Sequence, residues 1–222
     1  MENELTFTLG PVAIGTSVIT TWGIMLVIAT IARLSTRHLD MLLPGKLQTT
    51  VEGIVAAIDE AIAAVAPEHG RQLLPFIASL WLFLIIANLV GLIPGLHSPT
   101  RDLSVTSALA VLVFFSVHWF GIKTQGLTNY LQHYLSPTPI LLPFHIISEF
   151  TRTLALAVRL FGNMMSLEMA AVLILLVAGF LAPIPILMLH IIEALVQAYI
   201  FGMLALIYVA GAIQSQQLKS PE

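Results

Sequence analysis

Ionisable side chains stand within two long apolar stretches near the C-terminal end of this 222-residue chain. Residues 140–179 are apolar overall, yet they hold Glu149, Arg152, Arg159 and Glu168. An ionisable residue inside a bilayer costs about 2.5–3.5 kcal/mol on insertion scales, so each is a candidate for function. Arg159 lies 16 residues after Pro143, or roughly 24 Å along a helix. This depth makes it the hardest of the four to explain as a residue at the membrane surface.

The polar residues of this stretch recur at helical spacing, because residues 3, 4, 7 or 11 apart share one face of a helix. The face around Arg159 is accordingly predicted to carry Ser148, Arg152, Asn163 and Ser166, with His145 and Glu149 near its edge. Glu168 lies nine residues after Arg159, about 180° around the helix. Arg159 and Glu168 are therefore expected to serve different surfaces.

The last apolar stretch carries a second polar stripe, in which His190, Glu193 and Gln197 occupy positions i, i+3 and i+7. A fixed cation at mid-membrane repels protons and Na⁺ and attracts a carboxylate, while acidic and imidazole groups at other depths can relay protons. The two stripes together therefore predict ion movement.

Other chemistries find no support in the sequence. There is no cysteine, no phosphate-binding loop and no nucleophile–base pair, and His190 and Glu193 lack a clear third metal ligand. We predict no metal, no cofactor and no catalytic residue. Two purely structural alternatives stay open. Glu149 and Arg152 also fit an interfacial ion pair at i, i+3, and a lone Asn88 also fits a hydrogen bond between helices.

The composition places these residues in a membrane protein. The chain is 58% hydrophobic and 9% charged, against roughly 25% charged residues in a soluble domain, and its mean hydropathy is +0.95. No soluble fold of this size can bury that much apolar surface. This excludes an ordinary soluble domain, a nucleic-acid binder and a disordered chain.

Charge-free stretches that reach the ~20 residues a span needs, together with the longer apolar stretch 140–179, predict an all-α integral membrane protein with five membrane-embedded helices. The first stretch follows Glu2 and Glu4 rather than a basic region, so we expect a retained helix and not a signal peptide. Pro183 and Pro185 separate the last two helices into a hairpin. The predicted spans are 12–34, 72–95, 103–122 and the two helices of a hairpin over 140–217, all within a single membrane domain, 1–222.

Residues 44–66 differ from these spans, because apolar residues recur at helical spacing while Glu52, Asp59 and Glu60 fall on other faces. We expect an amphipathic helix that lies in the interface or packs against other helices; a surface helix on a cytoplasmic loop is the alternative. Basic residues cluster around this segment and near the C-terminus, and only Arg101 falls in the opposite loops. By this distribution the N-terminus is outside and the C-terminus cytoplasmic.

Two motifs resemble subunit a of F-type ATP synthases. The run Leu-Ala-Val-Arg-Leu-Phe-Gly-Asn-Met at 156–164, followed by Glu168, is similar to the signature of that family. The run from His190 through Gln-Ala-Tyr-Ile-Phe at 197–201 is similar to its last helix, and residues 88–94 and 102–106 also match. The resemblance covers about residues 70 to 213.

The resemblance implies a long tilted hairpin that packs against a rotating ring of c subunits. Arg159 would be the essential arginine, which draws the proton or Na⁺ off the ring carboxylate and blocks a leak between two aqueous half-channels. Asn163 and Gln197 would line the interface beside it, and Glu168 and His190 the half-channel that opens to the periplasm. The cytoplasmic half-channel would be lined by His145, Ser148 and Glu149.

The resemblance further implies a non-catalytic subunit of the bacterial inner membrane, surrounded by lipid. Its partners would be the c ring, the b subunits of the peripheral stalk and the remaining ATP synthase subunits, and no nucleic acid. Glu193 departs from the pattern, because many relatives have an apolar residue there; it either extends the proton path or pairs with His190. These motifs do not decide between H⁺ and Na⁺.

Two functions of other classes compete with this one. A secondary ion antiporter would favour paired halves and broken helices, and no repeat of that kind is visible. A structural scaffold gives no reason for Arg159 in an apolar helix.

Overall fold

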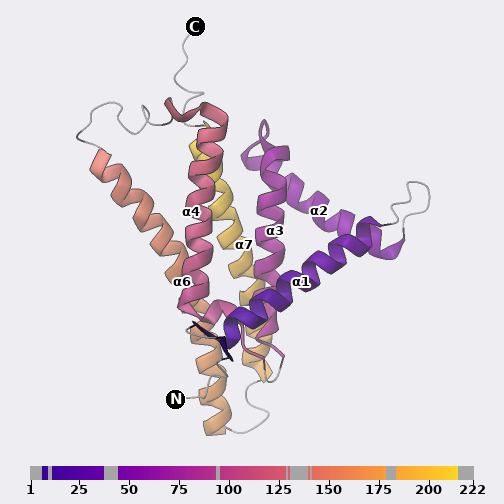
Figure 1. The fold of residues 1–222 in the computed structure, drawn as a ribbon. Helices are drawn as coiled ribbons and strands as arrows, with labels where there is room; N and C mark the ends of the chain where they lie inside the picture. Colours follow the sequence, from indigo (N-terminus) through magenta and orange to yellow (C-terminus); the bar gives the residue numbers. More distant parts are fainter. Residues whose placement is uncertain are drawn as a thin grey trace.

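A computed structural model describes residues 7–9, 12–37, 45–93, 96–128, 130, 140, 142–178 and 184–214. Five helices in this part of the chain are long and apolar enough to cross a membrane, and a sixth long helix, α2, is amphipathic. This confirms an all-α membrane fold with five candidate spans (Figure 1). The elements are, in order, β1 (Phe7–Leu9), β2 (Val12–Ile14), α1 (Thr16–Thr36), α2 (Lys46–Val65), α3 (Gly70–Val90), the 3₁₀ helix η1 (Pro99–Arg101), α4 (Leu103–Gln125), α6 (Leu142–Ala178) and α7 (Ile184–Gln214).

The last two helices form the expected hairpin. The 37 residues of α6 extend for about 55 Å, well beyond a hydrocarbon core of about 30 Å. A helix of that length has to incline or project, and Figure 1 shows α6 inclined relative to α4 and α7. The helix α4 packs against both members of the hairpin.

The contact between α3 and α7 depends on a glycine. A Cβ atom at Gly202 would fall on the indole ring of Trp81. That indole donates a hydrogen bond from Nε1 to the carbonyl oxygen of Tyr199 at 3.3 Å, and the two rings stack with centroids 5.8 Å apart. The two helix backbones therefore approach closely at this level.

The amphipathic prediction for 44–66 is confirmed over α2. Ile58 and Ile62 are buried in the core that α3 shares, while Glu52, Asp59 and Glu60 are exposed. The helix thus packs against a neighbouring helix through its apolar face.

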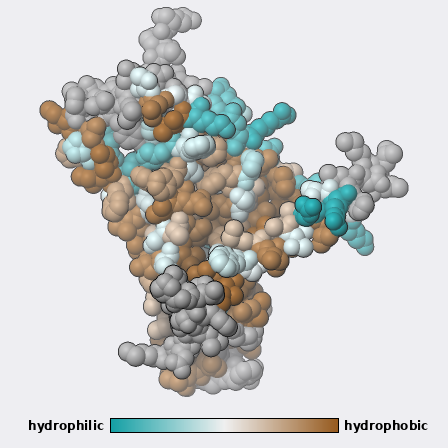
Figure 2. Space-filling view, viewed as in Figure 1, coloured by the Kyte–Doolittle hydropathy of each residue, from teal (hydrophilic) through white to brown (hydrophobic). Residues whose placement is uncertain are grey.

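Helix α1 leans away from the other spans in Figure 1, and Ile24 and Ser35 are its buried residues. Figure 2 shows hydrophobic residues over most of the visible face, with hydrophilic residues gathered at the end where α4 and α7 finish and at the tip where α1 approaches α2. Among the exposed apolar side chains of α1 are Trp22 and Leu26. Such a surface suits lipid or partner helices rather than water.

Two predicted boundaries differ from the structure. The first helix was expected from residue 12, but residues 12–14 form a strand antiparallel to residues 7–9, and extended Gly15 precedes the helix. The second span was expected to reach residue 95, but α3 ends at Val90 and the chain turns over residues 91–93. Apolar runs without charge do not mark such turns. The expected helical positions 44, 94–95, 141, 179 and 215–217 lie outside the described residues.

Candidate ion-translocation site

The two polar stripes of the hairpin meet at one point. Asn163 of α6 donates a hydrogen bond from Nδ2 to Oε1 of Gln197 on α7, at 2.6 Å. Gln197 is 2% exposed, and its Nε2 has no hydrogen-bond partner within the described part of the chain. An unsatisfied buried amide is costly, so Gln197 keeps a donor available for a group that reaches the seam.

Arg159 lies one helical turn before Asn163 but points to the outside of the chain. Its side chain is exposed, as are Ala155 one turn before it and Ser166 two turns after it on the same face. Across the residues that the structure describes, Arg159 has no ion pair, whereas Arg152 and Arg101 each have one. A charged guanidinium on the outer surface of a membrane-spanning helix is expensive. This position therefore calls for a carboxylate from another chain, or for water.

Glu168 faces a different surface, in agreement with the expected 180° separation. Arg101 Nη1 lies 2.9 Å from Glu168 Oε2, and the backbone N–H of Ser98 donates to Glu168 Oε1 at 3.2 Å. The Nδ1 atom of His97 is 3.9 Å from the same Oε2. The carboxylate is thus held by the loop between α3 and α4.

His190 is 3% exposed, and its Nε2 lies 3.4 Å from the carbonyl oxygen of Asn88. The Asn88 side chain donates to the Ala194 carbonyl oxygen at 3.1 Å and accepts from Thr100 Oγ1 at 2.8 Å. The interhelical hydrogen bond considered for Asn88 is therefore present. A short chain of hydrogen bonds continues from Thr100 to Ser98, whose hydroxyl oxygens lie 2.6 Å apart. The backbone N–H of Ser98 also donates to Glu168, so one loop residue contacts both Glu168 and the hydrogen-bonded group around Asn88.

The remaining predicted residues lie apart from this network. Glu149 and Arg152 form an ion pair at 3.3 Å, as the alternative of an i, i+3 ion pair predicts. The Arg152 guanidinium also lies 5.5 Å from the Tyr208 ring centroid. Ser148 and His145 are exposed one and two turns before Arg152 on α6. Glu193 is half-buried one turn from His190 on α7. Across the described ranges, no three His, Asp or Glu side chains gather as a metal-binding group.

Sequence reasoning missed three contributors to the site, namely Ser98, Thr100 and Arg101. They follow no helical period, because they lie in a loop and a 3₁₀ turn. Their contacts with Glu168 and Asn88 span between 12 and 70 residues of sequence. The one available signal is that Arg101 is the only Lys or Arg in the loops predicted to face outward, which by itself indicates topology and no partner.

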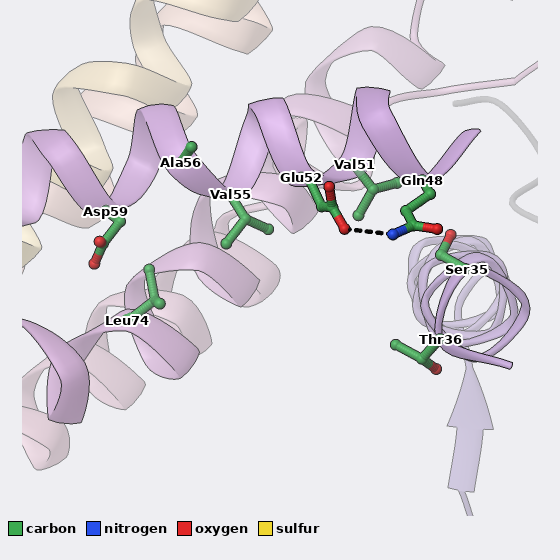
Figure 3. A pocket seen from close by; sticks show the side chains of 9 residues that line it. All are labelled: Ser35, Thr36, Gln48, Val51, Glu52, Val55, Ala56, Asp59 and Leu74. Atoms are coloured by element: carbon green, nitrogen blue, oxygen red, sulfur yellow. Dashed lines mark hydrogen bonds between the residues drawn. The ribbon is translucent and has the colours of Figure 1, made fainter. Parts of the chain in front are cut away.

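A separate groove lies between the ends of α1, α2 and α3 (Figure 3). Gln48 donates to Glu52 along its rim at 2.7 Å, and Val51, Val55 and Leu74 supply apolar walls. None of its lining residues belongs to α6 or α7. The groove is therefore not part of the candidate ion path.

The fold and the site together define a multi-pass helical membrane protein with ionisable groups arranged along a helical hairpin. Comparison with known proteins then gives the family. The family described as "ATP synthase A chain" matches residues 18–210, and the chain belongs to this family.

Three similar proteins are named as ATP synthase subunit a. The chain is 65% identical to ATP synthase subunit a 2 of Pelobacter propionicus, over 96% of this chain and 93% of that one. It is 66% identical to ATP synthase subunit a 1 of Hahella chejuensis, over 96% and 90%. It is 56% identical to ATP synthase subunit a of Legionella pneumophila strain Philadelphia 1, over 96% and 93%. Membership in this family makes the chain a component of an ATP synthase complex in a membrane.

Proposed function

We propose that this chain is the stator ion channel of a rotary ATP synthase. It provides two aqueous half-channels, and Arg159 couples the passage of H⁺ or Na⁺ through them to rotation of the c ring. The chain performs no catalysis itself; ATP synthesis or hydrolysis takes place elsewhere in the complex. It crosses a bacterial inner membrane several times, with its N-terminus outside and its C-terminus in the cytoplasm, and it also contacts the b subunits of the peripheral stalk.

The observation that carries this proposal is the separation of Arg159 from Glu168 on one helix. Arg159 is exposed on the outer surface of the hairpin, whereas both carboxylate oxygens of Glu168 are held inside the chain. A cation that faces outward from a membrane-spanning helix can be stabilised by an acidic residue of a neighbouring subunit. A carboxylate held inside the chain and a buried imidazole on the other helix of the hairpin can each accept and pass on protons.

The residues of the two proposed half-channels lie toward opposite ends of α6. Glu149 lies in the second turn of α6, and Glu168 lies 19 residues further on, about 29 Å along the helix axis. Arg159 is placed between them along the same helix. Protons from the outer side would use Glu168 and His190, and those leaving to the cytoplasm would pass His145, Ser148 and Glu149. The arginine between the two paths prevents direct passage, because a fixed positive charge repels cations.

Asn163, Gln197 and Glu193 complete the proposed path on the hairpin seam. The hydrogen bond from Asn163 fixes the Gln197 side chain next to the turn that holds Arg159. Glu193 stands one turn from both His190 and Gln197, which suits a relay between the outer half-channel and the ring-facing surface.

The proposal is tested with the complete ATP synthase reconstituted in liposomes. Arg159→Ala should abolish ATP-driven proton pumping, measured by quenching of a pH-sensitive dye, while the catalytic head still hydrolyses ATP. The matched control is Arg152→Ala, which removes another arginine from the same face of α6 and should keep most of the pumping. Glu168→Gln and His190→Ala should slow pumping less than Arg159→Ala.

Normal pumping by Arg159→Ala would refute the proposed mechanism. Losses in Glu168→Gln or His190→Ala that equal or exceed the loss in Arg159→Ala would show that the roles are wrongly assigned. High-turnover ion transport by the purified chain alone would favour an antiporter.

A further inference from the structure

Arg101 occupies a position for which the proposed mechanism so far gives no role. It ends the 3₁₀ helix η1 and is half-buried, with its Nη1 atom 2.9 Å from Glu168 Oε2. The other carboxylate oxygen accepts from the Ser98 backbone N–H at 3.2 Å. Glu168 is thus bound at both oxygens by one short loop.

The loop that carries Arg101 is firmly held in place. Ser98, Pro99 and Thr100 are all buried, with relative exposures no greater than those of core residues. The Ser98 hydroxyl oxygen lies 2.8 Å from the Ala87 carbonyl oxygen and 2.6 Å from Thr100 Oγ1, so its single hydrogen serves one of the two, and the Thr100 hydroxyl donates to Asn88 Oδ1 at 2.8 Å. Both contacts anchor the loop to the end of α3. Arg101 is therefore presented to Glu168 by a prepared backbone rather than by a freely moving loop.

The space around the carboxylate is also restricted. A Cβ atom at Gly91 would lie 3.0 Å from Glu168 Oε1 and 3.1 Å from Ser98 Cβ. Gly91, Ser98 and Arg101 therefore enclose the carboxylate from the side of the outer loop. The Arg101 side chain is 30% exposed, against 15% for Glu168, so the guanidinium is the more accessible member of the pair.

We propose that Arg101 is a positioning residue that controls proton access to Glu168 from the outer side. Its guanidinium holds the carboxylate against Ser98, and a proton that arrives from outside has to displace this ion pair. The proton passes from outer water to a Glu168 oxygen, and Arg101 stays protonated throughout because guanidinium does not lose its proton in proteins. This inference rests on the proposed function, since it assigns the control of a half-channel.

Among the described residues, the charged or titratable groups in printed contact with Glu168 are His97 and Arg101, both from the loop. On the elements packed against α6, Asp102 precedes α4 and is next to Arg101 in sequence, and the buried His190 lies on α7. Arg159 belongs to the same helix as Glu168 but faces the opposite surface. Removal of Arg101 thus takes away the closest positive charge, which opposes protonation of the carboxylate.

The test uses the whole ATP synthase in liposomes with its catalytic head outside, so that the lumen corresponds to the outer side. ATP synthesis is driven at a fixed membrane potential while lumenal pH is varied. Arg101→Gln should lower the lumenal proton concentration that half-saturates synthesis by about two- to fivefold, the range of partly exposed ion pairs. The maximal rate should change little. Arg101→Lys keeps the charge and should stay near the wild-type value.

Two further variants separate control of Glu168 from a structural role. In a Glu168→Gln background, Arg101→Gln should cause no additional shift. Arg101→Cys can be modified in the assembled complex, because the chain has no other cysteine. A positively charged aminoethyl reagent should restore the half-saturating concentration, and a neutral methyl reagent should not.

A half-saturating concentration unchanged by Arg101→Gln, or a shift that persists without Glu168, would overturn the inference. A wild-type rate that ignores lumenal pH would overturn it too. If Arg159→Ala abolishes pumping while the Arg101→Gln curve superimposes on wild type, the proposed function stands and only this inference fails. If Arg159→Ala pumps normally, the proposed function itself fails.

Discussion

The contact between Gly202 and Trp81 predicts a large effect for the smallest possible change. Gly202→Ala adds one methyl group, which would fall on the buried indole ring and force it to move. Movement of the ring removes the hydrogen bond from Trp81 Nε1 to the Tyr199 carbonyl oxygen and the stack of the two rings. The variant should therefore loosen α7 from α3.

The expected free-energy change combines terms of opposite sign. Alanine favours a helix over glycine by about 1 kcal/mol. Overpacking costs about 1–3 kcal/mol, and loss of the hydrogen bond and of the aromatic pair costs about 0.5–1.5 kcal/mol each. The net destabilisation is then about 1–5 kcal/mol, so the packing terms dominate the helix propensity.

The assay measures the thermal midpoint at which the purified complex, in detergent, loses this subunit. Gly211→Ala is the matched control, because Gly211 lies in the same helix and, among the described residues outside its own helical backbone, no atom stands within 4 Å of a Cβ there. That variant should be neutral or slightly stabilising. If Gly202→Ala and Gly211→Ala gave the same midpoint, the close approach of α3 and α7 would be refuted. A Trp81→Ala change in the Gly202→Ala background should cost less than in the wild type, since the clash is then removed.

Two other contacts give predictions of their own. Asn163→Ala should destabilise the hairpin by about 1–3 kcal/mol, because it leaves the buried Gln197 oxygen without its donor. Measured by thermal midpoints, the double change Asn163→Ala with Gln197→Leu should cost less than the sum of the two single changes. Simple additivity would contradict the hydrogen bond between the two side chains. Asp102 caps α4 by accepting from the Ser104 backbone N–H at 3.0 Å. Burial raises the pKa of Asp102, but hydrogen bonds from Ser104 and Ser17 and the charge of Arg101 together outweigh it and hold the pKa below its usual value. Since the pKa is lowered in the folded state, this stabilisation is present above the unfolded value and is lost as pH falls through the folded one. Asp102→Ala should therefore cost about 1 kcal/mol at pH 7 and progressively less below about pH 4, whereas a difference that did not depend on pH would contradict the cap.

Much of the fold follows from the sequence because a bilayer leaves few alternatives. A charge-free run of about 20 residues can satisfy its backbone in the membrane only as a helix, so the spans were predictable. Helical spacing also placed Asn163 and Gln197 on the faces that meet, and it separated Glu168 from Arg159. These are local properties of one helix.

The contacts that cross the fold were not predictable in the same way. Arg101 reaches Glu168 over 67 residues of sequence, and no period connects a loop residue to a helix face. The start of α1 was missed because apolar residues 12–14 fit a strand as well as a helix. Exact loop geometry, and therefore the environment of Glu168, depends on how α3 ends at Val90 and turns.

The central claim is that the Arg159 face of α6 lies against the c ring, and cysteine cross-linking tests it most directly. The chain contains no cysteine, so an introduced one is unique within it. Ser166 is exposed seven residues after Arg159 on the same face, and Met25 of α1 is 56% exposed on a helix that leans away from the hairpin. With a second cysteine one turn from the ring carboxylate, Ser166→Cys should form an oxidative cross-link to the ring subunit, and Met25→Cys should form none. A cross-link from Met25→Cys together with none from Ser166→Cys would contradict the account.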